Sequence, residues 1–258
     1  MANTAGRFVW HDLMSSDPDG AQKFYGKVAG WGTMPFEGSA MPYTMWTNNG
    51  SPLGGVSKIT DEMKKNGVGP SWMASVGVDN VDGSVAKANE LGGKTVVPAA
   101  DIPGAGRYAV ISDPQGVPIA IFQPSGEMGG GGGDAPGNGE FSWHELSTSD
   151  SNAAFDFYSK MFGWEETSVH DMGEMGAYRM YGQGGVPYGG MMTRTPEMPP
   201  PNWLNYIHVA DAKESAKTIA DAGGKVIMGP MEVPGGDWIA IATDPQGAPF
   251  AVHSSKPN

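Results

Sequence analysis

An internal repeat constrains this chain more than any other feature of its sequence. The stretch FVWHDLMSSD at 8–17 returns as FSWHELSTSD at 141–150. Near the end of each copy, SDPQGVPIAIF at 112–122 matches TDPQGAPFAVH at 243–253. A period this long is typical of a duplicated domain, because solenoid repeats span only roughly 20 to 50 residues.

The repeat predicts two domains joined by a short connection. We place the first domain at 1–123 and the second at 141–258. Between them lies PSGEMGGGGGDAPGNGE at 124–140, which cannot bury apolar surface and is typical of a flexible linker. Two copies of a domain in one chain can pair with each other, as two identical single-domain chains pair in a dimer. We therefore expect an internal pseudo-dimer of the two domains, as a monomer or a homodimer.

Composition excludes several classes of function. The chain has 258 residues, of which 39% are hydrophobic, so it can bury a core. A net charge of −12 argues against nucleic acid, whose phosphates are bound by clustered Lys and Arg. The absence of cysteine excludes disulfides and thiolate chemistry. No apolar stretch suits a signal peptide or a membrane span, so we expect a cytoplasmic protein without a membrane partner.

Within each copy, the sequence pattern predicts a strand, a helix and three strands, and this order occurs twice. RFVWHDLMS alternates like a strand, and Asp17 followed by Pro18 supplies a helix N-cap and a first-turn proline. An apolar stripe at helical spacing follows, and Gly30 is placed to end that helix in a left-handed conformation. The second copy repeats these signals with Asp150 and Gly163.

These motifs together resemble the vicinal oxygen chelate superfamily. The matching features are FY…GW in the first helix, GG after the second helix, and DPQG before the last strand, in both copies. The resemblance covers both copies almost end to end and extends to the tandem, glyoxalase-like branch with W-x-[D/E]-L on the first strand. It implies an α+β fold of paired βαβββ modules, whose curved mixed sheets enclose a cleft in each domain. The superfamily includes glyoxalases, extradiol dioxygenases and bleomycin-sequestering proteins, so the resemblance alone does not fix an activity.

The resemblance also locates the three metal ligands of metal-dependent members. In this sequence those positions hold Trp10, Met73 and Ala120 in the first copy, and Trp143, Leu204 and Ala251 in the second. None of these side chains suits a borderline or hard divalent ion, since methionine sulfur is a soft ligand. His11 and His144 stand one residue away, and a one-residue shift turns a strand side chain to the opposite face. We therefore expect no metal and no other cofactor.

Two routes to a metal site stay open. A β-bulge would turn His11 or His144 into the cleft. In addition, His208 and His253 are expected to face the cleft of the second copy. Together with His144, or with His11, they would form a displaced three-histidine site for a divalent metal. The simpler interpretation keeps His11 and His144 beside a helix with local hydrogen bonds, and leaves the other two to contact ligand or solvent.

Carboxylates on the first strand of each copy are candidates for chemistry. The face that carries Trp10 also carries Asp12, and the face that carries Trp143 also carries Glu145. Asp12 and Glu145 are candidate general bases, because desolvation beside an indole raises the pKa of a carboxyl group. They are equally suited to accept hydrogen bonds from a neighbouring group or from a cationic ligand.

Aromatic and sulfur side chains favour a binding protein. The candidate ligand-binding residues are Trp10, Met14, Met73, Trp143, Tyr206, His208 and His253. Flat aromatic walls and soft methionine surfaces suit an adaptable apolar pocket. Trp46, Trp72 and Trp203 either extend these walls or fill the core. GGGGG at 129–133 lacks the ending of a phosphate loop, and the sequence has no GxSxG or other nucleophile motif.

The leading hypothesis is a metal-free protein that captures a small apolar or aromatic molecule in a Trp-rich cleft. The resemblance to bleomycin-sequestering proteins would make this detoxification or resistance by capture. The alternative is a metal-dependent lyase of the glyoxalase type or a dioxygenase of the extradiol type, using the displaced histidines or a first-strand carboxylate. A third hypothesis is a scaffold whose clefts are vestigial.

Overall fold

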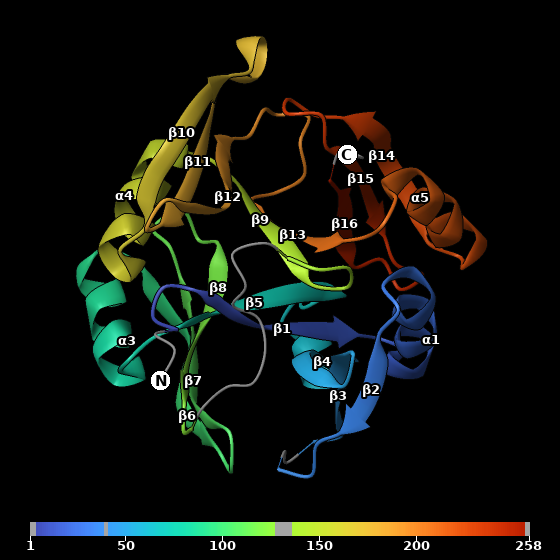
Figure 1. Cartoon of the computed structure of the whole chain (residues 1–258). Helices are drawn as coiled ribbons and strands as arrows, with labels where there is room; N and C mark the ends of the chain where they lie inside the picture. Colours follow the sequence, from blue (N-terminus) through green and yellow to red (C-terminus); the bar gives the residue numbers. More distant parts are fainter. Residues whose placement is uncertain (1–3, 39–40, 127–135, 256–258) are drawn as a thin grey trace. The chain divides into compact units, whose positions relative to one another are not determined.

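The computed structural model describes residues 4–38, 41–126 and 136–255. The predicted linker at 124–140 lies partly outside the described residues, which resume at 136. Each copy runs strand, helix, three strands, and then strand, helix, three strands again (Figure 1). The predicted α+β class is therefore confirmed.

The first copy forms one mixed eight-stranded sheet in the order β2-β3-β4-β1-β5-β8-β7-β6. The central pairs β1–β4 and β5–β8 are parallel, whereas the hairpin partners are antiparallel. Its strands are β1 (Phe8–Ser15), β2 (Gly32–Pro35), β3 (Tyr43–Asn48), β4 (Ser51–Lys58), β5 (Ser71–Gly77), β6 (Lys94–Ile102), β7 (Gly106–Ser112) and β8 (Pro118–Pro124).

The second copy repeats this topology, with the order β10-β11-β12-β9-β13-β16-β15-β14. Here the parallel pairs are β9–β12 and β13–β16. Its strands are β9 (Phe141–Thr148), β10 (Glu165–Asp171), β11 (Ala177–Gln183), β12 (Val186–Thr193), β13 (Asn202–His208), β14 (Lys225–Glu232), β15 (Trp238–Thr243) and β16 (Pro249–Ser254).

The helices begin and end where the sequence signals them. The Asp17 side chain accepts a hydrogen bond from the backbone of Gly20 at 3.1 Å, and both Gly30 and Gly163 have φ of 72° just beyond their helices. A short helix (α2) and a 3₁₀ turn (η1) add to the predicted pattern. The helices are α1 (Pro18–Val28), α2 (Asp61–Lys65), α3 (Val81–Glu90), α4 (Ser151–Phe162), α5 (Ala212–Asp221) and η1 (Gly173–Met175).

The side chain of Asp150 caps the N-terminus of α4. The Asp150 carboxylate accepts hydrogen bonds from the backbone N–H groups of Asn152 and Ala153, at 3.1 and 3.0 Å. We expect Asp150→Ala to lower the free energy of unfolding by about 1 kcal/mol, because these N–H groups have no partner within the helix. Urea unfolding measures this change. Asp156→Ala, at an exposed position inside the same helix, is the matched control and should change stability little.

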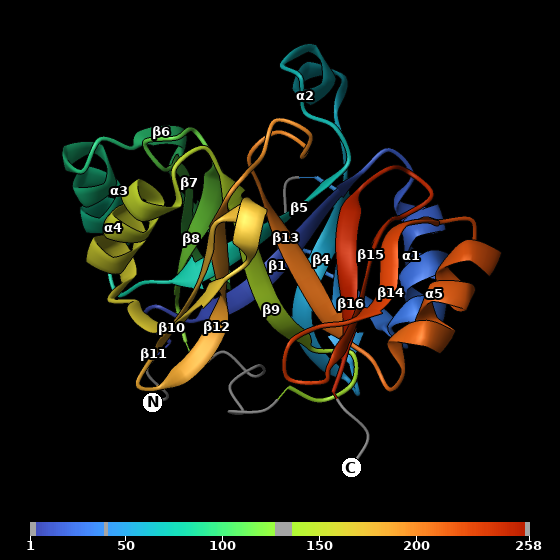
Figure 2. The same ribbon diagram turned by 90° about the horizontal axis from the view of Figure 1, so that it is seen from above.

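Packing does not follow the two sequence copies. Each compact unit takes one βαβββ half from each copy. Unit 1 draws on Met1–Trp10, Met73–Met128 and Trp143–Trp203, and unit 2 on His11–Trp72, Gly129–Ser142 and Leu204–Asn258. Within unit 1, α3 lies beside α4, and within unit 2, α1 lies beside α5 (Figure 2). The boundaries at 123 and 141 stay a prediction about the repeated sequence.

Two family motifs meet in the core of each unit. In unit 1, the Tyr158 hydroxyl of the second FY motif donates to the Asp113 carboxylate of the first DPQG turn, at 3.1 Å. In unit 2, Tyr25 of the first copy donates to Asp244 of the second, at 3.4 Å. Burial raises the pKa of both aspartates. The motifs therefore join halves that come from different copies.

Most tryptophans fill these cores. Trp46, Trp72 and Trp203 are 0%, 6% and 7% exposed, and all three belong to the packed clusters of buried residues. The interpretation of these three as core residues is therefore the correct one. No helix in the described part of the chain is long and apolar enough to cross a membrane.

Candidate functional site

The first strand of each copy has one buried and one half-buried face. On β1, His11 and Leu13 are buried, whereas Trp10, Asp12 and Met14 are half-buried. On β9, the same alternation leaves Trp143 and Glu145 half-buried and His144 buried. The indole and the carboxylate of each copy are therefore the accessible groups, as the side-chain alternation of a strand predicts.

A tyrosine two strands away in the same sheet holds each carboxylate. In unit 1, the hydroxyl of Tyr178 on β11 donates to Oε2 of Glu145 at 2.9 Å. The same hydroxyl accepts a hydrogen bond from Nε1 of Trp143 at 2.8 Å. Burial, and then the negative charge of Glu145, raise the pKa of Tyr178, so it remains a hydrogen-bond donor. In unit 2, Tyr43 on β3 donates to Asp12 in the same way.

Glycine pairs make room for these tyrosines. A Cβ atom on Gly190 would overlap the ring of Tyr178, and a Cβ atom on Gly55 would overlap the ring of Tyr43. The tyrosine ring thus lies close to the backbone of the strand between it and the carboxylate. The repeated Gly-Gly of LGGVSK and YGGMMT was the available sequence signal for this contact, because glycine inside a strand often marks a close approach.

The first-strand histidines lie on the buried face. The ring of His144 stacks on Phe8 with centroids 3.6 Å apart, and its Nδ1 lies 3.2 Å from the carbonyl oxygen of Tyr188. Burial lowers the pKa of His144 to about 3, so its ring is neutral. His11 stacks on Phe141, also at 3.6 Å. Each ring is therefore buried against a phenylalanine from the other copy of the repeat, and the simpler interpretation, a position beside a helix with local hydrogen bonds, stays a prediction.

His208 and His253 do come together in unit 2. Their residues are paired across β13 and β16, and their ring centroids are 5.4 Å apart. His208 contacts Asn138 and Ser255 through its two ring nitrogens, at 3.0 and 3.1 Å. Burial lowers the pKa of His208. Tyr206, two residues earlier on β13, is only 3% exposed.

The residues present do not fit the metal of the family. Met73, Leu204, Ala120 and Ala251 occupy two of the three family positions in both copies, and the last three are buried. Among residues 4–38, 41–126 and 136–255, no three His, Asp or Glu side chains gather closely enough to hold a metal ion. His144, the third member of the displaced histidine site, is engaged with Phe8 and Tyr188 instead.

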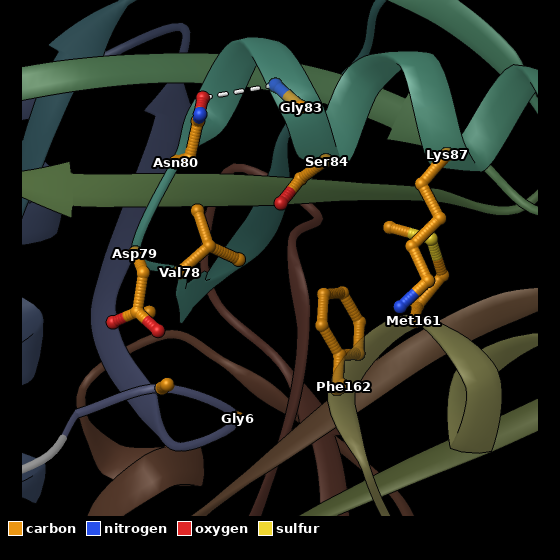
Figure 3. Close-up of a pocket in the computed structure, with 11 residues that line it drawn as sticks. Gly6, Val78, Asp79, Asn80, Gly83, Ser84, Lys87, Met161 and Phe162 are labelled. Atoms are coloured by element: carbon orange, nitrogen blue, oxygen red, sulfur yellow. Dashed lines mark hydrogen bonds between the residues drawn. The ribbon is translucent and has the colours of Figure 1, made fainter.

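Unit 1 also has a pocket of about 260 Å³ that none of the predicted site residues lines. Figure 3 shows Met161 and Phe162, at the end of α4, facing Ser84 and Lys87 on α3. Gly77 at the end of β5 borders the same space. In the repeat, Gly77 of the first copy aligns with His208 of the second, so the residue at this position differs between the two copies. The sequence offered no signal for it, because the residues that line it come from segments far apart in the chain.

Comparison with known proteins places the chain in a family. The model described as Glyoxalase/Bleomycin resistance protein/Dioxygenase superfamily matches residues 141–252. "Putative glyoxylase CFP32" of Mycobacterium bovis is 34% identical over 252 residues, which cover 96% of this chain and 94% of that protein. "Anthracycline biosynthesis protein DnrV" of Streptomyces peucetius is 26% identical over 264 residues, which cover 96% and 92%.

A solved structure shows the same fold at much lower identity. The 2,3-dioxygenase LapB from Pseudomonas sp. KL28 superimposes with a TM-score of 0.70 and 12% identity, covering 100% of this chain and 94% of that chain. This likeness confirms the predicted tandem fold and carries no activity with it. With a relative of 34% identity along nearly its whole length, the chain belongs to the Glyoxalase/Bleomycin resistance protein/Dioxygenase superfamily.

Proposed function

We propose that the protein binds a small aromatic molecule at the half-buried faces of β1 and β9, without a metal. One observation carries this proposal: in both copies a half-buried tyrosine donates to the half-buried first-strand carboxylate. The arrangement persists although the carboxylate is Asp12 in one copy and Glu145 in the other. Detoxification or resistance by capture is the role that such binding would serve.

The geometry favours binding over proton abstraction. Tyr178 occupies one acceptor site of Glu145 and fixes the orientation of the carboxylate beside the indole of Trp143. A carboxylate held in this way accepts a hydrogen bond from a ligand hydroxyl or amine, while the indole offers a flat apolar wall. Asp12 and Glu145 are therefore proposed as ligand acceptors, and the general-base role stays a prediction.

The metal-ligating side chains available in the described residues support binding without a metal. The alternative enzyme needs three ligands around one divalent ion, and the described residues do not supply them. Trp10, Met14, Trp143 and Met73 are half-buried and offer apolar surface beside the strands. The Met14 sulfur accepts a hydrogen bond from Ser57 at 3.2 Å, which fixes that side chain.

The proposal is tested with a matched pair of probes. We expect 1-naphthol to bind more tightly than 1-methylnaphthalene, because only 1-naphthol donates a hydrogen bond to the carboxylate. Glu145→Gln should weaken 1-naphthol binding to its site in unit 1 by about tenfold, as charged hydrogen bonds contribute about 1.5 to 3 kcal/mol. It should leave 1-methylnaphthalene unaffected. Equilibrium dialysis measures both affinities, and an anthracycline is a further probe because DnrV is named for anthracycline biosynthesis.

Glu165→Gln is the control, since this exposed residue on β10 has the same charge in the same copy. Asp12→Asn repeats the test in unit 2. The absence of saturable binding, or an equal affinity for both probes, would contradict the proposal. Circular dichroism of each variant checks that the fold is intact.

A further inference from the structure

Three polar side chains of unit 2 form a hydrogen-bonded chain that the proposed binding function does not use. Oγ of Ser142, at the start of β9, lies 3.0 Å from Nδ1 of His253 on β16. Nε2 of His253 lies 3.1 Å from Oδ2 of Asp237, directly before β15. We call these residues the Ser–His–Asp cluster. A hydroxyl, an imidazole and a carboxylate linked in this order have the connectivity of a nucleophile, a base and an orienting group.

The first copy shows that the fold does not require this cluster. Alignment of the repeated motifs sets Ser142, His253 and Asp237 opposite Val9, Phe122 and Gly106. A Cβ atom on Gly106 would lie 2.9 Å from the ring of Phe122, so that ring fills the space above the glycine. The same module therefore folds with apolar groups at all three positions. The second copy differs from the first at all three positions, and each of the three residues there contributes a polar group to the cluster.

The hydrogen bonds determine how His253 carries its proton. A carboxylate can only accept, so Nε2 donates its hydrogen to Asp237. In the neutral ring, Nδ1 then has the lone pair and accepts the hydroxyl hydrogen of Ser142. The carbonyl oxygen of Tyr206 is a second acceptor for this hydroxyl, at the longer distance of 3.4 Å. The shorter bond directs the hydroxyl to the imidazole, as a general base requires.

The neighbouring histidine does not compete for this proton. His208 lies roughly perpendicular to His253, and its ring nitrogens contact Asn138 and Ser255. Burial and the neighbouring His253 lower the pKa of His208, which keeps its ring neutral near pH 7. His253 is thus the imidazole of this pair that contacts both a hydroxyl and a carboxylate.

We propose that Ser142 is a nucleophile toward small activated aryl esters, with His253 as its base and Asp237 as a positioning residue. Oγ of Ser142 attacks the ester carbonyl carbon and forms a C–O bond, while its proton passes to Nδ1 of His253. The bond from that carbon to the aryl oxygen breaks, and the phenolate takes the proton from His253. Water then attacks the acyl group with the same base, which releases the carboxylic acid and restores the serine.

The solvent exposure of the Ser–His–Asp cluster limits the substrates on which it can act. The side chains of His253 and Asp237 are 19% and 40% exposed, so small molecules reach them and solvent screens their interaction. A screened carboxylate assists the imidazole weakly. The cluster therefore acts on esters with good leaving groups, and it is not expected to cleave amides.

Covalent labelling tests the proposal directly. A fluorophosphonate probe is expected to phosphonylate Ser142, with loss of fluoride, and peptide mass spectrometry locates the adduct. His253→Phe introduces the residue of the first copy and should slow labelling at least about a hundredfold, the usual scale of general-base assistance. Asp237→Asn should slow it about tenfold while the probe concentration for half-maximal rate is unchanged, as a positioning role predicts.

Ser147→Ala, on the same strand, is the matched control and should label as the wild type does. Release of p-nitrophenol from p-nitrophenyl acetate should fall in parallel with labelling in His253→Phe, and Ser142→Ala should abolish both. Absence of an adduct at Ser142 in the wild type would overturn the proposal, as would an unchanged labelling rate in a folded His253→Phe variant. Circular dichroism establishes that each variant is folded.

Discussion

Gly189→Ala is expected to lower the free energy of unfolding by about 3 kcal/mol or more, the upper range for overpacking a well-packed site. Gly189 on β12 is paired with His144 on β9, and a Cβ atom there would overlap the carbonyl oxygen of His144. It would also lie 2.6 Å from the hydroxyl of Tyr181, which donates to that same carbonyl at 2.9 Å. The obstacle is mostly backbone, so the two strands would have to move apart.

Urea unfolding of the purified variant measures this loss. Gly69→Ala is the control, because no atom lies within 4 Å of a Cβ at that position. There we expect no loss and a gain of up to about 1 kcal/mol, since alanine restricts the unfolded chain. A loss below about 1 kcal/mol at Gly189 would contradict the expectation, because it would show that β9 and β12 have room for a methyl group there.

The second large effect is a loss of stability in acid that depends on His144. Burial lowers the pKa of His144 from 6.5 to about 3, so the unfolded chain takes up a proton at a pH where the folded chain does not. The contribution of the neutral ring is complete above pH 6.5 and is lost as the pH falls through this window. At pH 5 the loss amounts to about 2 kcal/mol.

His144→Phe removes this titration and keeps an aromatic ring against Phe8. Its absolute stability also changes, because the hydrogen bond to the carbonyl oxygen of Tyr188 is lost. The informative quantity is therefore the difference in the free energy of unfolding between pH 8 and pH 5. This difference should be about 2 kcal/mol smaller in the variant than in the wild type. His170→Gln, at an exposed position, should leave it unchanged, and equal differences in all three proteins would refute the assignment.

Much of the fold was predictable because its signals are local and appear twice. Asp17 and Asp150 cap their helices through backbone atoms two to three residues away, and Gly30 and Gly163 follow the helix ends with φ of 72°. The placement of His144 on the face opposite Trp143 also followed from strand alternation, once the resemblance had placed Trp143 toward the cleft. Each of these inferences needs only spacing along the chain.

The partners within the candidate sites were not predictable, because they depend on distances between strands. Tyr178 reaches Glu145 from β11; the glycine pair of β12 marks a close approach there, but it does not identify which side chain makes it. Ser142 and His253 are separated by 111 residues, and no local motif marks the serine. The sequence also did not predict which segments form each compact unit, since the repeat shows which segments are related but not which pack together.

Each of the two hydrophobic cores contains segments from both copies, and this affects how the sequence can evolve. A cut in the glycine-rich segment would leave each fragment with half of two hydrophobic cores, so the fragments should need each other to fold, as in split-protein complementation. Covalent linkage keeps the halves at equal amounts in every molecule. The two copies are then free to differ, as they do at Ser142 and His253, a division of labour that an assembly of identical subunits does not permit.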